Sequence, residues 1–249
     1  MRYLVLLLLL FSHPVIYAQN AHALNKNAAY TVKLNGNSYD VYKAANKGQD
    51  VQLYWKNDKG TILKTLGNLK AYTATKHKKL LFAANAGMYT TENAPKGLYI
   101  ENYKTLRKID LKQGPATNFY MQPNGVFYST ASGAHIATTQ AYTKQKEKVK
   151  YATQSGPMLV IDGAINKTFA KGSANINIRN AVGIDENGNV FLVISEGLVN
   201  FYDLATLFKE KLHCNNALFL DGGISRSYIP DLQRMDNDGD FGVMVGVTE

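Results

Sequence analysis

The chain has 249 residues, 45% of them hydrophobic, and a formal net charge of +9 at pH 7. Its lysines and arginines are spread over many segments and form no basic stripe interleaved with aromatic residues, which argues against nucleic acid as a partner. A diffuse positive charge would favour anionic small molecules or an anionic envelope surface, although it also serves solubility alone. The single cysteine, Cys214, excludes an internal disulfide, so packing has to stabilise the fold.

Residues 1–18 predict a signal peptide. Arg2 precedes an apolar run from Leu4 to Phe11, and Ala18 stands at a suitable cleavage point. The run is shorter than the roughly 20 apolar residues that a membrane-spanning helix needs, so we expect no stable membrane insertion after cleavage. An uncleaved amino-terminal anchor is the alternative. The pattern indicates a periplasmic or secreted protein.

Short runs of β-branched and aromatic residues, separated by turn residues, predict a fold rich in strands. The first is a hairpin in which Tyr30–Leu34 and Tyr39–Tyr42 flank an Asn-Gly-Asn turn. Further strands are predicted at 51–55, 80–84, 97–103, 125–129, 134–138, 158–161, 180–185, 190–195 and 217–220. The pattern predicts an α+β fold with a strand-rich, mixed or antiparallel sheet core and a few packed helices.

Three helices are predicted. Residues 62–79 place leucines at helical spacing, and residues 204–212 carry one apolar face with Asp203 at its amino-terminal end. The lysine-rich stretch 143–151 lacks helix breakers, so we expect a short exposed helix there. Cys214, flanked by apolar residues, is expected to be a buried thiol.

Short sequences with a polar residue beside glycine follow several apolar strands. They are Asn85-Ala86-Gly87-Met88-Tyr89, Gln154-Ser155-Gly156-Pro157, Arg179-Asn180-Ala181-Val182-Gly183 and Asp221-Gly222-Gly223-Ile224-Ser225. Glycine lets the backbone approach a ligand closely and frees N–H groups for anions. Any one of these sequences could be an ordinary turn. Together they indicate a site.

In this order the sequences resemble those of the phosphodiester glycosidase family. They are similar to its Asn-Gly-Gly-Phe-Phe, Gln-Ala/Ser-Gly-Pro, Arg-Thr-Ala-x-Gly and Leu-Asp-Gly-Gly elements, and Pro123–Tyr128 resembles a bacterial block. The resemblance covers roughly residues 78–247 and implies a glycosidase-like domain at 78–249. With the predicted signal peptide at 1–18, this leaves an amino-terminal extension at 19–77 made of strands and a helix. It implies hydrolysis of the sugar C1–O bond in a glycosyl phosphodiester of the N-acetylglucosamine 1-phosphodiester type.

Two positions depart from the family pattern. Asn180 stands where threonine is usual, and Ile224 replaces a third glycine. The first change keeps a hydrogen-bonding side chain, whereas the second narrows the freedom of the backbone. These departures suggest a subfamily with a different substrate and leave a catalytically weak relative open.

The catalytic candidates are Asp221, Glu196 and Arg179. A phosphate monoester leaves more readily than a sugar alcohol, so the site has less need of a strong general acid than of a carboxylate and an anion-binding group. Asp221 follows a buried strand and is the first candidate for the carboxylate. Glu196 is the second candidate, as base or stabiliser, and Arg179 could hold the phosphate.

The substrate-binding candidates share strand ends or neighbouring glycines. They are Asn85, Gly87, Met88, Gln154, Ser155, Gly156, Asn180, Gly222, Gly223 and Ser225. Asn85 and Gln154 could hydrogen-bond sugar hydroxyls or an acetamido group. The expected partner is a sugar-phosphodiester small molecule or an envelope glycan.

No metal ligand is assigned, and calcium is the one cofactor left open. Asp236, Asp238 and Asp240 alternate like the start of a calcium loop, but Phe241 and Val247 stand where an EF-hand needs glycine and glutamate. The histidines show no zinc-ligand spacing. Two alternative functions remain: a non-catalytic secreted protein of the same fold that binds carbohydrate or the envelope, and a phosphodiesterase that cuts the P–O bond.

Overall fold

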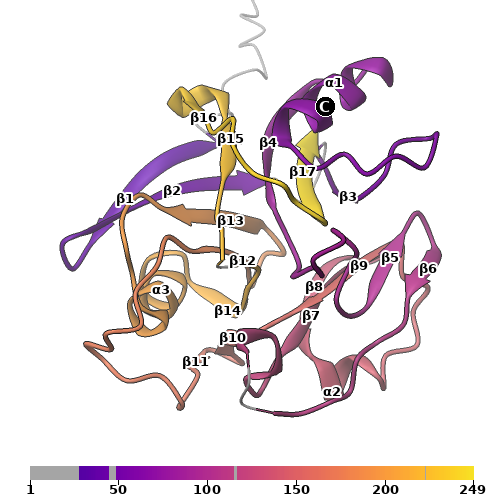
Figure 1. Cartoon of the computed structure of the whole chain (residues 1–249). Helices are drawn as coiled ribbons and strands as arrows, with labels where there is room; N and C mark the ends of the chain where they lie inside the picture. Colours follow the sequence, from indigo (N-terminus) through magenta and orange to yellow (C-terminus); the bar gives the residue numbers. More distant parts are fainter. Residues whose placement is uncertain (1–27, 45–48, 115–116, 222) are drawn as a thin grey trace, which may run out of the picture.

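The computed structural model describes residues 28–249 except 45–48, 115–116 and 222, so the predicted signal peptide lies outside the described residues. Within the described part, the strands pair antiparallel and form three sheets (Figure 1). The seven-stranded sheet has the order β1-β2-β13-β12-β14-β10-β11. The other two have five strands each, in the orders β16-β15-β4-β17-β3 and β6-β5-β9-β7-β8. This confirms the predicted α+β class.

The seven-stranded sheet consists of β1 (Ala29–Leu34), β2 (Asn37–Ala44), β13 (Val190–Ser195), β12 (Asn180–Asp185), β14 (Cys214–Phe219), β10 (Met158–Ile161) and β11 (Ala164–Ile165). The second sheet consists of β16 (Arg234–Met235), β15 (Ser227–Ile229), β4 (Leu80–Asn85), β17 (Met244–Thr248) and β3 (Asp50–Tyr54). The third consists of β6 (Lys104–Arg107), β5 (Tyr99–Glu101), β9 (Tyr151–Ser155), β7 (Gly125–Thr130) and β8 (Gly133–Thr138).

Short helices connect the strands. They are α1 (Leu66–Thr75), α2 (Thr139–Tyr142), α3 (Phe201–Thr206), which continues as the π-helical turn η2 (Leu207–Lys211), and the 3₁₀ turns η1 (Asn118–Tyr120) and η3 (Pro230–Leu232). No helix in the described ranges is long and apolar enough to cross a bilayer.

The predicted amino-terminal hairpin forms as β1 and β2. Asn35 and Gly36 adopt φ of 50° and 78°, as the tight turn between two strands requires. β2 then pairs with β13, and β3 pairs with β17. The strands that precede residue 78 are therefore part of the same sheets as the strands that follow it.

The main core lies between the three sheets. Phe82, Tyr99 and Val182, one from each sheet, belong to one cluster of buried side chains. A second cluster, which includes Phe208 and Phe219, fills the space between the opposite face of the seven-stranded sheet and α3. Successive residues of β12 and β14 therefore point alternately into the two clusters.

Helix α1 is shorter than the predicted 62–79. Thr65 caps its start by accepting a hydrogen bond from the N–H of Asn68 at 3.0 Å, and His77 adopts φ of 56° just after its end. Leu66 and Leu69 are buried beside β4. The leucine spacing thus predicted the buried face of α1, and the Thr65 cap determines where the helix begins.

The predicted helix at 143–151 is wrong. The short helix α2 ends at Tyr142, and Tyr151 already begins β9. Its lysines give the segment no apolar face to bury, and β9 has to pair with both β5 and β7.

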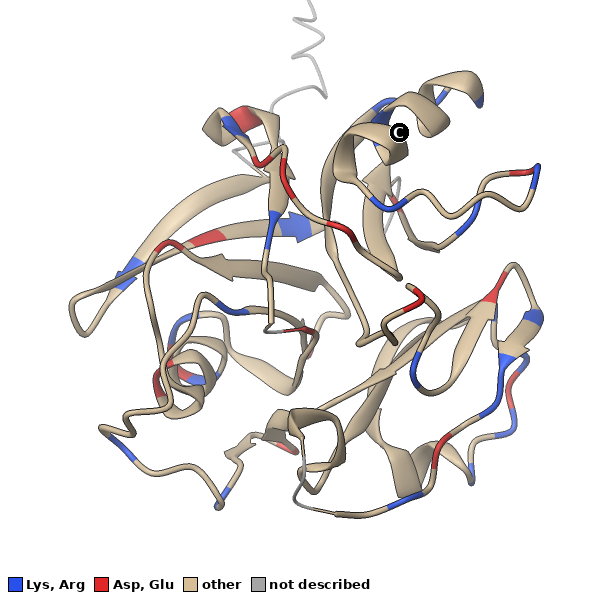
Figure 2. Cartoon of the chain, in the orientation of Figure 1, with Lys and Arg blue, Asp and Glu red and all other residues tan. Residues whose placement is uncertain are grey.

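Across the described chain, the lysines and arginines lie on strands, helices and loops alike (Figure 2).

Candidate functional site

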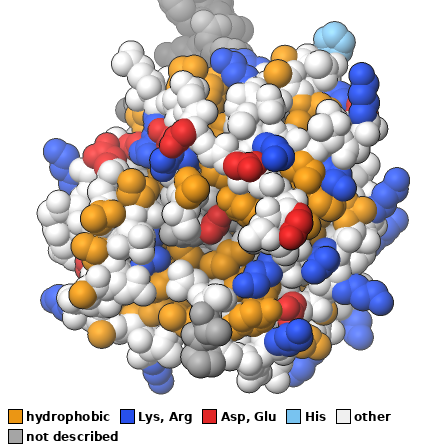
Figure 3. All heavy atoms as spheres, viewed as in Figure 1, with side chains coloured by type: hydrophobic (Ala, Val, Ile, Leu, Met, Phe, Trp, Pro, Cys, Tyr) orange, Lys and Arg blue, Asp and Glu red, His pale blue; other side chains and the backbone are white. Residues whose placement is uncertain are grey.

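Ends of strands from all three sheets meet at the centre of the view in Figure 1. β4 ends at Asn85, β12 begins at Asn180, and the chain leaving β14 reaches Asp221 two residues after the strand ends. Ser155, at the end of β9, donates its hydroxyl to the carbonyl of Leu220. The glycine-rich sequences that are far apart in the chain are therefore neighbours in space. Figure 3 shows a hollow near the centre of this face, with hydrophobic and acidic side chains in and around it.

Asn85 is the hub of this site. Its Nδ2 donates to Asp221 Oδ2 at 3.3 Å and to the carbonyl of Ile224 at 2.7 Å. Its Oδ1 accepts from the N–H of Arg226 at 2.9 Å and from Asn180 Nδ2 at 3.1 Å. The amide is fully buried, and these bonds use both of its donors and both acceptor sites. It therefore fixes the groups around it, and direct binding of a sugar by Asn85 stays a prediction.

Asp221 is partly exposed and is held from several sides. Its backbone N–H donates to Asn180 Oδ1 at 3.1 Å, and its carbonyl accepts from the hydroxyl of Ser225 at 2.9 Å. Its Oδ1 accepts from the N–H of Gly223 at 3.3 Å. The backbone and the carboxylate are thus both positioned by neighbours, which is the arrangement that a reacting carboxylate needs.

Asn180 connects two sheets. Its Nδ2 donates to the carbonyl of Asn85 at 2.6 Å, and its own carbonyl accepts from the N–H of Leu220 at 3.2 Å. The predicted site residues that these contacts bring together are Asn85, Ser155, Asn180, Asp221, Gly223 and Ser225. The predicted Gly222 lies outside the described residues.

Gly87 has a packing role. A Cβ atom at Gly87 would lie 1.9 Å from Thr153 Oγ1, which shows that the backbone passes directly against β9. Gly156 is packed similarly, because a Cβ there would lie 2.6 Å from Asn124 Cβ. Met88 is partly buried and packs against the cluster under α3. These residues shape the site through backbone approach and packing.

The Gln154 side chain points away from Asp221 and is buried. Its Oε1 accepts from the N–H groups of Leu98 and Asp110 at 3.0 and 2.9 Å, and its Nε2 donates to the carbonyl of Asp110 at 2.7 Å. In this arrangement the amide ties the 98–110 segment to β9. Substrate binding by Gln154 stays a prediction.

Arg179 is fully buried on the face of β12 opposite to Asn180. Its Nε donates to the carbonyl of Val199 at 2.8 Å, and its Nη2 donates to the backbone and side-chain oxygens of Asn175 at 2.9 Å. The guanidinium carbon lies 3.8 Å from the centre of the Phe201 ring. Nη1 has no partner among the described residues. Burial lowers the pKa of Arg179 to about 10, so the group remains charged at neutral pH.

Glu196 is exposed and stands beside β2, where its backbone N–H donates to the carbonyl of Ser38 at 2.9 Å. Glu196 directly follows β13, and in the sheet order β12 lies between β13 and β14, which leads to Asp221. None of the hydrogen bonds among the described residues around Asn85 and Asp221 involves the Glu196 side chain, and a catalytic role for it stays a prediction.

The three alternating aspartates have different partners. Asp238 pairs with Arg226, Asp240 with Lys64, and Asp236 with Arg234. Within the described ranges, no group of three or more histidine, cysteine, aspartate or glutamate side chains could share a metal ion. A calcium site therefore stays a prediction from the sequence.

Two residues near Asp221 were missed in the list of candidates. Burial, and to a smaller extent the charges of Asp221 and Asp240, raise the pKa of Tyr89 to about 12. Arg226 donates its N–H to Asn85 and follows the predicted Ser225 directly. Tyr89 ends the glycine-rich sequence that begins at Asn85. The signal that could have identified Tyr89 and Arg226 is their position beside predicted site residues in the sequence.

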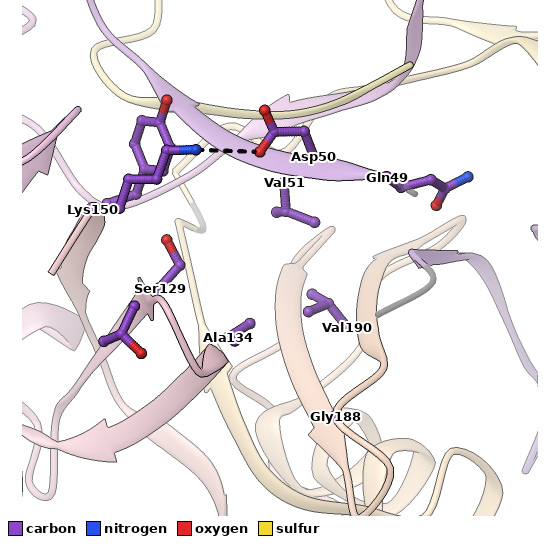
Figure 4. Close-up of a pocket in the computed structure, with 11 residues that line it drawn as sticks. Gln49, Asp50, Val51, Ser129, Ala134, Lys150, Gly188 and Val190 are labelled. Carbon is purple, nitrogen blue, oxygen red and sulfur yellow. Dashed lines mark ion pairs between the residues drawn. The ribbon is translucent and has the colours of Figure 1, made fainter. Parts of the chain in front are cut away.

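A separate cavity of about 160 Å³ lies where β3, β7, β8 and β13 approach one another (Figure 4). Lys150 and Asp50 face each other there, with Nζ 3.9 Å from Oδ1. In the strand register, Asp50 lies opposite Thr248 at one end of β17, and Asn85 lies opposite Met244 at the other end of β17. This cavity is therefore at the opposite end of the strands from Asp221, and none of the predicted site residues lines it.

The fold resembles that of two solved structures. One is the catalytic domain of zebrafish N-acetylglucosamine-1-phosphodiester alpha-N-acetylglucosaminidase, auto-inhibited by its pro-peptide, with a TM-score of 0.62, 16% identity, and coverage of 89% of this chain and 81% of that one. The other is a putative exported protein from Burkholderia pseudomallei K96243, with a TM-score of 0.53, 12% identity, and coverage of 85% and 74%. At these identities the likeness concerns the fold.

Sequence comparison identifies the family. The uncharacterized protein YigE of Escherichia coli K12 is 37% identical over 189 residues, which are 76% of this chain and 73% of YigE. The phosphodiester glycosidase family pattern matches residues 78–247, in agreement with the extent of the motif series. The chain therefore belongs to the phosphodiester glycosidase family.

Proposed function

We propose that the protein is an exported hydrolase that cleaves the sugar C1–O bond of a glycosyl phosphodiester. The observation that carries the proposal is the partly exposed Asp221 carboxylate, which Asn85 and Asn180 fix where strands of three sheets meet. Family membership supports glycosidase chemistry on phosphodiesters. Export is supported by the amino-terminal leader pattern and by the likeness to a protein described as exported.

In the proposed reaction, the C1–O bond to the phosphate breaks and its electron pair leaves with the phosphate monoester. Positive charge develops at C1 and the ring oxygen, where the Asp221 carboxylate stabilises it. Water then supplies the oxygen that bonds to C1 and releases a proton to solvent. Asp221 acts as stabiliser or as nucleophile, and Glu196 remains the second candidate for the base.

The remaining candidates have positioning or binding roles. Asn85, Asn180 and Ser225 orient Asp221 through their hydrogen bonds, and Ser155 fixes the preceding residue through the carbonyl of Leu220. We propose that Gly223, where an added Cβ would meet nothing within 4 Å, leaves room beside Asp221 for the sugar. An N-acetylglucosamine 1-phosphodiester is the substrate type that the family resemblance favours.

Arg179 supports an anionic substrate through its charge. None of the carboxylates in the described ranges lies within 4.0 Å of its guanidinium, so the positive charge is not neutralised by an ion pair there. A charge in a medium of low dielectric constant acts over a longer range than one in water. Because its side chain is covered, we propose that Arg179 favours the phosphate through the electric field that it produces.

The test is hydrolysis of an α-linked N-acetylglucosamine phosphodiester by the purified protein in ¹⁸O-labelled water. We expect free sugar that carries the label, because water attacks C1. Label in the phosphate would instead show P–O cleavage and identify a phosphodiesterase. Binding of a panel of sugar phosphodiesters with no turnover would favour the carbohydrate-binding alternative.

Substitution of the carboxylate is the sharpest variant test. Asp221→Asn should lower kcat by about 10³-fold or more while the protein stays folded, because the amide keeps the shape but carries no charge. Asp231→Asn, a carboxylate on the exposed face of η3, is the matched control and should keep wild-type kcat. Full activity of Asp221→Asn would contradict the proposal.

Export is tested independently of catalysis. We expect the native protein to be recovered from the periplasm or the medium with residues 1–18 removed, as intact-mass measurement would show. Recovery of the uncleaved chain with the membrane fraction would instead support the anchor.

A further inference from the structure

Arg226 is attached to the candidate site through its backbone. Its N–H donates to Asn85 Oδ1 at 2.9 Å, and the same amide donates to Asp221 through Nδ2. β15 pairs with β4 as far as Ser227 opposite Ala84, so Arg226 directly precedes the paired strand, next to the end of β4. The Arg226 side chain therefore starts beside the amide that holds Asp221.

The Arg226 guanidinium is held in a two-point ion pair. Its Nε and Nη2 donate to Asp238 Oδ1 and Oδ2, both at 2.5 Å. Its Nη1 donates to the carbonyl of Ser225 at 2.9 Å, and the Ser225 hydroxyl bonds to the backbone of Asp221. The guanidinium is thus oriented by the loop that also carries the candidate carboxylate.

Exposure distinguishes Arg226 from Arg179. The Arg226 side chain is 27% exposed, whereas Arg179 has no exposed surface. The Asp238 side chain is 66% exposed, so its release to water requires no opening of the core. Water screens an ion pair with this exposure, so even the bidentate geometry makes only a modest contribution to stability.

The two Asp238 oxygens occupy the positions that two phosphate oxygens take in a bidentate contact with arginine. We propose that Arg226 binds the phosphate group of the substrate directly and that Asp238 occupies this anion site in the unliganded protein. The identity of the anion rests on the proposed function, whereas the exchange itself rests on the geometry of the pair.

This exchange would favour the reaction as well as binding. A phosphodiester carries one negative charge, as Asp238 does, so the two compete on similar terms for Arg226. The charge on the departing phosphate oxygens increases as the C1–O bond breaks, and a guanidinium interacts more strongly with that state than with the substrate. Asp238 would also shield the site from weakly binding anions.

The experiment measures anion binding without turnover. Titration calorimetry with inorganic phosphate and with glycerol 3-phosphate would compare the full protein with three variants. We expect Arg226→Gln to weaken binding of both probes by about 10–100-fold, because a charged hydrogen-bonding partner is lost. Asp238→Asn should strengthen binding several-fold, because the competing carboxylate is removed.

Lys64→Gln is the matched control. It removes one positive charge and the partner of Asp240, which belongs to the same acidic segment. We expect it to change phosphate affinity by less than about twofold, because a surface charge acts only through a screened field. An affinity in Arg226→Gln no lower than in Lys64→Gln would overturn the proposal, and so would an Asp238→Asn protein that binds no phosphate.

This test and the hydrolase test fail in different ways. If Arg226 governs phosphate affinity but no substrate is hydrolysed, the anion site stands and the proposed catalysis is wrong. If sugar is released while Arg226→Gln keeps full phosphate affinity, the hydrolase stands and this inference is wrong.

Discussion

Arg179 and Arg226 lie near the same strand ends but in opposite surroundings. Arg179 is sealed between β12 and α3, stacks on Phe201, and donates to oxygens of two neighbouring segments. Arg226 is partly exposed and donates to an exposed carboxylate. The two residues differ mainly in what surrounds them: one guanidinium is part of the core, and the other can meet a ligand.

The comparison shows that residue type and motif position do not decide whether a charge is available. A guanidinium suits phosphate, and Arg179 precedes Asn180 in a recognisable sequence, so the sequence favours Arg179 as the phosphate ligand. The alternation of side chains along β12 turns these neighbours to opposite faces. Asn180 reaches Asn85, whereas Arg179 reaches Val199 and Asn175.

The largest difference is expected in stability. Arg179→Ala should lower the free energy of unfolding by about 3–5 kcal/mol, because it leaves a cavity and deprives the carbonyl of the buried Val199 of its donor. Arg226→Ala should lower it by less than about 1 kcal/mol, because its partner can turn to water. Urea unfolding followed by Trp55 fluorescence would measure both. Equal losses in the two variants would contradict the distinction between core and ligand-accessible arginine.

A smaller effect is expected at Asn180, the residue that joins the two regions. Asn180→Ala removes the acceptor for the Asp221 N–H and the donor to Asn85, so Asp221 is less well positioned. We expect kcat to fall by about 10–100-fold with little change in KM, since the loss concerns the geometry of the transition state.

Asn180→Thr is the control, because threonine is the usual residue of the family pattern and retains a donor and an acceptor. It should keep most of the activity that Asn180→Ala loses. A rise in KM with unchanged kcat in Asn180→Ala would show instead that Asn180 binds the substrate in its ground state.

Much of the fold follows from local signals. The Asn-Gly turn specified the β1–β2 hairpin, and the apolar run before Asp221 specified the buried β14. The convergence of Asn85, Asn180 and Asp221 was predictable because each polar group follows or begins a buried strand, and a polar group at such an end needs partners.

The direction of each side chain was not predictable from these signals. Gln154 and Ser155 are neighbours in one motif, yet Gln154 bonds to the 98–110 segment and Ser155 bonds beside Asp221. The difference depends on which face of β9 meets which sheet, and that is decided by pairing between distant strands. The wrong helix at 143–151 has the same origin, because local propensity there yields to the pairing of β9.

The smallest expected effect concerns the Arg226–Asp238 pair itself. Asp238→Asn should leave the thermal unfolding midpoint within about 2 °C of the wild type near neutral pH, because both groups remain solvated when the pair is lost.

The effect of the pair on stability should depend on pH, because Arg226 lowers the pKa of Asp238 below its ordinary 3.8. Whatever stability the pair contributes is therefore present above that value and is lost as the pH falls through the lowered pKa of the folded state. The two midpoints should converge in that acidic range. A large loss of stability in Asp238→Asn at neutral pH would make Asp238 a structural partner of Arg226 and would leave little room for an exchange with phosphate.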